Sequence, residues 1–324
     1  MLQSHVDNPA FLKLFVVFLG IAVITVPLTK RFGLGSVLGY LIAGSILGPW
    51  GLGLVSDVHT IMGFSELGVL LLLFVIGLEL QPRRLWGMRK AVFGLGAGQL
   101  FGTSALLTLA GVALGFSLPI SLVAGLGLSL SSTAFTLQTL AERRSLNTAY
   151  GRASFAILLF QDLAVIPLLG LVPLLSGGTE QTHFLVSLAK VSAVIAAVVV
   201  GGRYLLRPAL RLVAAANIRE VFAAAALLVV VGSAMAMEAV GLSMELGTFL
   251  AGLLLADSEY RHQLETDIEP FKGLLLGLFF MAIGMSVDYG IILREPLIVL
   301  AVTLGFMLIK FLVVYGLARA AQFS

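Results

Sequence analysis

The sequence predicts an all-α polytopic membrane protein, and three observations carry this prediction. Hydrophobic residues make up 59% of the 324 residues and charged residues only 11%, against roughly 25% charged residues in soluble domains. The mean hydropathy is +1.06. Apolar residues form unbroken runs such as 67–76, which differ from the alternating pattern of a transmembrane β-barrel strand. Together these features exclude a disordered chain, a collagen and an ordinary cytosolic enzyme.

The apolar runs divide the chain into membrane-spanning segments. A spanning helix needs roughly 20 mostly apolar residues. About eleven segments qualify, near 11–29, 36–50, 63–80, 91–115, 119–140, 152–175, 183–202, 219–238, 240–256, 270–288 and 296–319. The sequence contains no cysteine and no recognisable catalytic or nucleotide-binding motif. We therefore expect no enzymatic activity, no cofactor in this chain and no nucleic-acid partner.

Lysine and arginine residues fall mainly on one side of these spans. Sixteen of the 20 basic residues lie in or beside the loops of that side. Cytoplasmic loops of membrane proteins carry an excess of Lys and Arg. The bias therefore predicts an N-terminus outside the cell and a cytoplasmic C-terminus.

Asp162 is the clearest functional candidate, because it lies in the middle of the span 152–175. A carboxylate at the bilayer centre costs roughly 2.5–3.5 kcal/mol on insertion scales. Gln161 precedes it, so the pair offers oxygen ligands that suit a hard monovalent cation. Burial favours the neutral form of a carboxyl group, so a proton and a cation can compete for Asp162. The alternative is a structural ion pair with Lys310, which lies inside the last span.

The span 119–140 contains a dense group of hydroxyl side chains. The group consists of Ser129, Ser131, Ser132, Thr133 and Thr136. Such residues compete with backbone hydrogen bonds and weaken a helix locally. Secondary transporters use broken helices near the membrane midplane to expose backbone carbonyls to ions. The group therefore predicts a broken helix beside Asp162, with ordinary hydrogen bonding between helices as the alternative.

Acidic residues gather in the segment 257–270, on the side predicted to be cytoplasmic. Five carboxylates lie there, and the positive-inside pattern does not require them. The segment is either a solvated loop or a docking and regulatory surface for a basic partner. Glu245, inside the short span 240–256, stays ambiguous.

Several stretches resemble the Kef-type glutathione-gated potassium efflux transporters of the monovalent cation:proton antiporter 2 group. They are GLGSVLGYLIAG (33–44), LLFVIGLEL (72–80), LSSTA (130–134), LFQDL (159–163), EYRH (259–262) and DIEPFKGLL (267–275). The resemblance covers nearly the whole chain. The Gln-Asp pair and the acidic string are its most specific parts, because the glycine pattern alone is a weak signal.

This resemblance implies a cation/proton antiporter fold with inverted repeats and a broken crossing helix. It also implies a homodimer in a bacterial inner membrane. Residues 1–85 and 205–290 would form the dimerisation part, and 91–175 and 296–319 the ion-carrying core. The implied activity is potassium:proton antiport, in which K+ leaves the cell and H+ enters. The alternatives are a gated K+ channel and a truncated membrane subunit that does not transport.

The resemblance also implies roles for individual residues. Gln161 and Asp162 would bind K+, and Asp162 would exchange it for a proton. Further ion-binding oxygens would come from Ser131, Ser132 and Thr133, and Lys310 would balance the charge of Asp162. The regulatory loop would include Glu265, Asp267 and Glu269.

Members of this family have further spans and then a cytosolic domain that binds nucleotide and glutathione. Glutathione holds such systems closed, and glutathione adducts of electrophiles open them. With about eleven spans in this sequence, we expect an incomplete second repeat and no soluble regulatory domain here. A quinone-reductase-like cytosolic subunit is a further partner that the resemblance implies.

Overall fold

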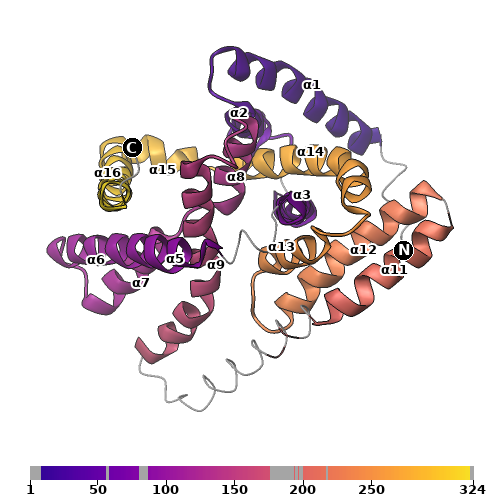
Figure 1. The fold of residues 1–324 in the computed structure, drawn as a ribbon. Helices are drawn as coiled ribbons and strands as arrows, with labels where there is room; N and C mark the ends of the chain where they lie inside the picture. The colour runs from indigo at the N-terminus through magenta and orange to yellow at the C-terminus, as the bar shows by residue number, and fades with distance from the viewer. Residues whose placement is uncertain are drawn as a thin grey trace. The chain divides into compact units, whose positions relative to one another are not determined.

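The computed structural model describes residues 9–55, 58–79, 87–175, 200–216 and 218–321, together with positions 193 and 196. The elements of this described part are helical (Figure 1), which confirms the predicted all-α class. The chain divides into two compact units, residues 1–69 with 269–296 and residues 70–268 with 297–324. Because this division is based on compactness, it does not test the predicted dimerisation part or the predicted ion-carrying core, and both stay predictions.

The first unit is built on a helical hairpin and the end of a long helix. It contains α1 (Pro9–Arg31), α2 (Ser36–Leu47), the start of α3 (Val58–Glu79), the end of α14 (Arg261–Met285) and α15 (Tyr289–Arg294). Its buried core consists of Phe18, Ala43, Leu47, Val55, Met281 and Met285. A Cβ atom at Gly44 would collide with the backbone of Met281, so glycine allows α2 and α14 to pack closely.

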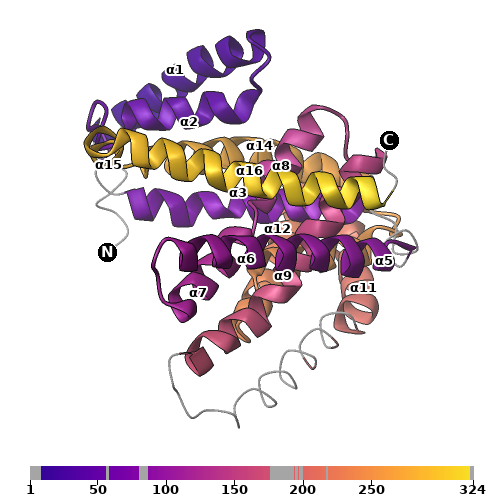
Figure 2. The same ribbon diagram turned by 90° about the vertical axis from the view of Figure 1, so that its left-hand side faces the viewer.

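The second unit holds every residue discussed below as a candidate ion ligand. Its remaining elements are α5 (Arg89–Ala91), a π-helical turn (Val92–Gly96), α6 (Ala97–Ala113), α7 (Leu118–Ser129), α8 (Thr133–Glu142), α9 (Ala149–Leu175), a second π-helical turn (Gly202–Leu206), α11 (Arg207–Ala215), α12 (Arg219–Glu238), α13 (Met244–Leu255) and α16 (Pro296–Ala320). α6 and α7 form a hairpin and lie side by side in both views (Figures 1 and 2). Gly115 has a φ of +92° in the turn between them, a conformation that favours glycine.

Six helical stretches in the described residues are long and apolar enough to cross a membrane, judged by length and composition. They are Ile61–Glu79, Arg89–Ala113, Leu118–Glu142, Arg219–Glu238, Arg261–Arg294 and Pro296–Ala320. α2 and α13 are shorter apolar helices. Most of the predicted span 183–202 lies outside the described residues. These helices agree with a multi-pass membrane protein.

The stretch from α7 to α8 is interrupted where the hydroxyl side chains predicted a break. α7 ends at Ser129 and α8 begins at Thr133. Between them, Leu130 (φ −64°, ψ 158°) and Ser132 (φ −70°, ψ 109°) have extended backbones. The Ser132 hydroxyl caps α8 by accepting a hydrogen bond from the backbone N–H of Phe135 at 3.2 Å. We call residues 130–132 the helix break.

Candidate ion site

Two buried glutamine side chains hold the helix break from the side of α6 and α9. The side-chain oxygen of Gln161 accepts a hydrogen bond from the backbone N–H of Ser131 at 2.8 Å. The side-chain N–H groups of Gln161 and Gln99 both donate to the carbonyl of Ser129, at 3.5 and 3.1 Å. The two amides are also joined to each other at 2.5 Å. The last carbonyls of a helix lack intrahelical partners. The two glutamines donate hydrogen bonds to one of them, the carbonyl of Ser129, at the end of α7.

Lys310 contacts the same break from α16. Its ammonium group donates hydrogen bonds to the carbonyl of Leu130 and to the hydroxyl of Ser131, the latter at 3.0 Å. The ammonium therefore lies at the carboxyl end of α7, where the helix dipole favours a positive charge. The ion pairs found among the described residues do not include one between Lys310 and Asp162. The role of Lys310 in balancing the charge of Asp162 stays a prediction.

Asp162 lies at the centre of α9 and faces the start of α8. The hydroxyl of Thr133 donates a hydrogen bond to the Oδ1 atom of Asp162 at 3.4 Å. Thr133 is the first residue of α8, so the end of the break determines where this hydroxyl lies. The structure thus brings Thr133 directly to Asp162, whereas Ser131 contacts Lys310 and Ser132 caps α8.

A second carboxylate shares the surroundings of Asp162. Glu245, in the first turn of α13, lines the same small cavity as Asp162 and Thr133. Because both carboxylates border the same space, their charges interact. The other lining residues are Leu73, Phe155, Leu158, Leu159, Leu246 and Phe249. The carboxylates therefore meet in largely apolar surroundings, where like charges repel more strongly than in water.

The size and chemistry of this cavity suit one small cation. The cavity volume is about 10 Å³, which is close to the minimum for a single water molecule. Its ligand atoms are carboxylate and hydroxyl oxygens, which prefer hard cations. A cation or a proton between the two carboxylates would relieve their repulsion.

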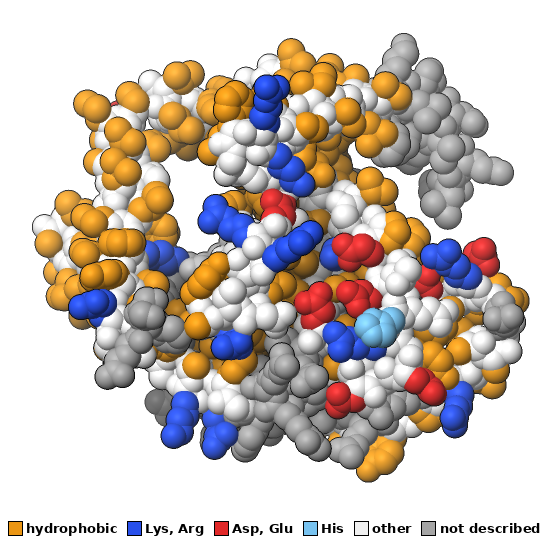
Figure 3. Space-filling view, turned by 45° about the horizontal axis from the view of Figure 1, so that its top comes forward, with side chains coloured by type: hydrophobic (Ala, Val, Ile, Leu, Met, Phe, Trp, Pro, Cys, Tyr) orange, Lys and Arg blue, Asp and Glu red, His pale blue; other side chains and the backbone are white. Residues whose placement is uncertain are grey.

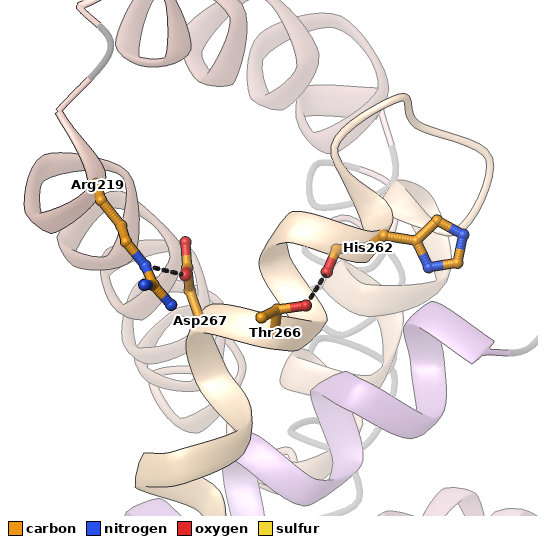
Figure 4. Close-up of polar contacts among 4 residues, drawn as sticks. All are labelled: Arg219, His262, Thr266 and Asp267. Carbon is orange, nitrogen blue, oxygen red and sulfur yellow. Dashed lines mark hydrogen bonds and ion pairs between the residues drawn. The ribbon is translucent and has the colours of Figure 1, made fainter.

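Charged side chains also gather at the acidic segment (257–270). Figure 3 shows acidic and basic side chains together on one face of the molecule. Asp267 is 7% exposed and its Oδ1 atom accepts a hydrogen bond from Arg219 at 3.0 Å (Figure 4). The hydroxyl of Thr266 donates to the carbonyl of His262 at 2.8 Å, as the same view shows. Buried Asp267 is therefore engaged within the chain through one oxygen.

The remaining acidic-loop candidates have local partners. Glu265 lies 3.9 Å from the imidazole Nδ1 of His262. Glu269 forms an ion pair with Lys272 at 2.7 Å. The second oxygen of Asp267, Oδ2, has no hydrogen-bond partner among the described residues. That buried oxygen remains able to accept a further hydrogen bond.

Sequence reasoning missed Gln99 and left Glu245 ambiguous. Gln99 is 1% exposed and is the one amide side chain of α6, whose other polar side chains are hydroxyls. A lone amide within a predicted span is a usable signal, because a buried amide needs partners. Glu245 begins the short α13, and its sequence position does not show that α13 faces α9.

Comparisons with known proteins agree with this architecture. A family profile described as "Sodium/hydrogen exchanger, transmembrane" matches residues 16–324. A solved structure of the sodium proton antiporter MjNhaP1 from Methanocaldococcus jannaschii at pH 8 has a TM-score of 0.66 and 18% identity. The similarity covers 97% of this chain and 79% of that one. At this identity the match shows the fold alone, and it confirms the antiporter fold expected from the sequence.

Curated relatives are much closer in sequence. Glutathione-regulated potassium-efflux system proteins KefC from Escherichia coli strains CFT073 and UTI89 are each 52% identical over 310 residues. The aligned region covers 95% of this chain and 50% of each relative. The chain thus spans about half the length of the curated relatives that it matches. The resemblance to Kef-type proteins, restricted to a membrane domain, is confirmed.

Proposed function

Since the chain belongs to the sodium/hydrogen exchanger family, we propose that it exchanges K+ for H+ across a bacterial inner membrane. The family is one of transporters rather than enzymes. The choice of K+ is supported by relatives that are named as potassium-efflux proteins. The observation that carries the proposal is the cavity in which Asp162, Thr133 and Glu245 meet beside the helix break.

In the proposed cycle, Asp162 binds K+ and H+ in turn. The hydroxyl of Thr133 and the carboxylate of Glu245 supply further oxygens to the cation. The helix break allows such a site to form at membrane depth, because its freed backbone groups are held by buried side chains. Movement of the ion-carrying core would expose the site alternately to each side.

The proposal extends to assembly and control of the whole protein. We infer a homodimer in the lipid bilayer, with the N-terminus outside and the C-terminus in the cytoplasm. Control by glutathione and its adducts, through a nucleotide-binding regulatory domain, is proposed by analogy with the named relatives. By the same analogy we propose that a basic regulatory partner docks near Glu265, Asp267 and Glu269. A quinone-reductase-like subunit is a further candidate partner.

A liposome experiment tests the proposed exchange. Purified protein is reconstituted with a pH-sensitive dye inside, and an outward K+ or Na+ gradient is imposed. We expect the K+ gradient to drive protons inward, and we expect Asp162→Asn to abolish that movement while the protein stays folded. Potassium flux without coupled proton movement would instead identify a channel. The absence of any flux from folded protein would contradict transport by this chain.

A further inference from the structure

We propose that Gln99 is a positioning residue of the ion site, which acts by holding the amide of Gln161 against the helix break. This inference rests on the proposed function. It gives Gln161 a role in supporting the break. Gln99 belongs to α6, whereas Gln161 precedes Asp162 on α9.

The hydrogen bonds of Gln99 fix the direction of both amides. A glutamine side chain has two N–H donors and one oxygen acceptor. Gln99 donates to the hydroxyl of Thr103 at 3.2 Å and to the carbonyl of Ser129 at 3.1 Å, and its oxygen accepts from Gln161. The oxygen of Gln161 is thereby turned toward the N–H of Ser131. Rotation of either amide by half a turn would bring two oxygens together.

This arrangement holds one peptide group of the break from opposite sides. The carbonyl of Leu130 and the N–H of Ser131 belong to the same planar peptide, and in the trans form they point in opposite directions. Gln161 accepts from the N–H, and Lys310 donates to the carbonyl. The orientation of this peptide affects where α8 begins, and Thr133 at that position contacts Asp162. Gln99 thus affects the position of Thr133 indirectly, through its hydrogen bond with Gln161.

The pairing of α6 and α7 does not depend on Gln99 alone. Further along the hairpin, the hydroxyl of Thr108 donates to the carbonyl of Ser121 at 3.3 Å. Thr108 is 8% exposed, against 1% for Gln99. Thr108→Val is therefore a matched control, because it removes a buried hydrogen bond between the same two helices at a distance from the break.

Two measurements on the reconstituted protein test the role of Gln99. We expect Gln99→Leu to raise the KM for K+ about tenfold, which corresponds to a loss of roughly 1.4 kcal/mol of binding free energy. The change in kcat should be smaller. Hydrogen–deuterium exchange in the peptide that contains Ser131 should accelerate in the same variant. Thr108→Val should change neither quantity. An unchanged exchange rate at Ser131 in Gln99→Leu would overturn the proposal.

A double variant separates a positioning role from an independent one. If Gln99 acts through Gln161, Gln99→Leu combined with Gln161→Leu should raise the KM no further than Gln161→Leu alone. Multiplying effects on the KM would overturn the proposal. If the unaltered protein moves neither ion, the proposed function fails, and the exchange rate at Ser131 then decides the positioning role by itself.

Discussion

The helix break and the acidic segment are both rich in polar side chains, yet they are held together differently. At the break, side chains from α6, α9 and α16 reach residues that are 30 to 180 positions away in the sequence. In the acidic segment most contacts join residues three or four positions apart. Arg219 and Asp267, in contrast, form an ion pair between residues that are 48 positions apart.

This difference predicts how strongly each region responds to substitution. Buried hydrogen bonds are costly to leave half-made, and Gln99 and Gln161 are only 1% and 2% exposed. Exposed pairs within one helix contribute little, since water screens them. Single changes at the break should therefore alter both stability and transport, whereas changes in the acidic segment should be mild.

The largest effect is expected for Lys310→Met. The substitution keeps a long side chain but leaves the carbonyl of Leu130 without its donor. We expect the free energy of unfolding to fall by about 1–3 kcal/mol and K+/H+ exchange to be lost. Chemical denaturation and the liposome assay measure the two quantities. Arg319→Met, on an exposed position of the same helix, is the control, and equal effects of the two variants would contradict the comparison.

Glu245→Gln should act on transport more than on stability. The amide keeps the size of the side chain but removes the negative charge that faces Asp162. Because an attractive charge next to the cation is lost, we expect the KM for K+ to rise by roughly three- to tenfold. The liposome assay at several K+ concentrations measures this change. Glu238→Gln, at the exposed end of α12, should leave the KM unchanged, and a wild-type KM for Glu245→Gln would exclude it from the site.

Arg219→Ala probes the long-range ion pair of the acidic segment. The Arg219 side chain is 71% exposed and that of Asp267 is 5% exposed. We expect a loss of about 1 kcal/mol in the free energy of unfolding, because Asp267 would lose its cation. Adding Asp267→Asn should recover part of the loss, which a double-mutant cycle measures. Strict additivity would show that the two side chains do not interact.

The smallest effect is expected for Glu269→Gln. Its ion pair with Lys272 lies within one helix, and the Glu269 side chain is 57% exposed. The free energy of unfolding should change by less than about 0.5 kcal/mol. Thermal and chemical unfolding both report this quantity. A loss comparable to that of Lys310→Met would erase the contrast between the two regions.

The sequence predicted the parts of the fold that depend on local composition. The apolar runs predicted the helical membrane class, and the hydroxyl-rich residues predicted the break before Thr133, which the structure confirms. A mid-span carboxylate was also sufficient to single out Asp162. Each of these signals lies within a few adjacent residues, so no knowledge of helix packing was needed.

The partners of these residues could not be predicted in the same way. Gln99 lies 62 residues from Gln161, and Glu245 belongs to a separate helix. Which helices face one another depends on packing that a single sequence does not reveal. The sequence likewise did not predict that the ammonium of Lys310 donates to Leu130 and Ser131. A charge in a span therefore indicates a polar partner, but it does not identify that partner.

The peptide between Leu130 and Ser131 is held by side chains rather than by a neighbouring backbone. Backbone contacts survive most substitutions, but these contacts depend on the identities of residues 99, 161 and 310. As related proteins diverge, we expect positions 99 and 161 either both to keep an amide side chain or both to lose it. Position 310 should accept only side chains that can donate a hydrogen bond to the carbonyl of Leu130.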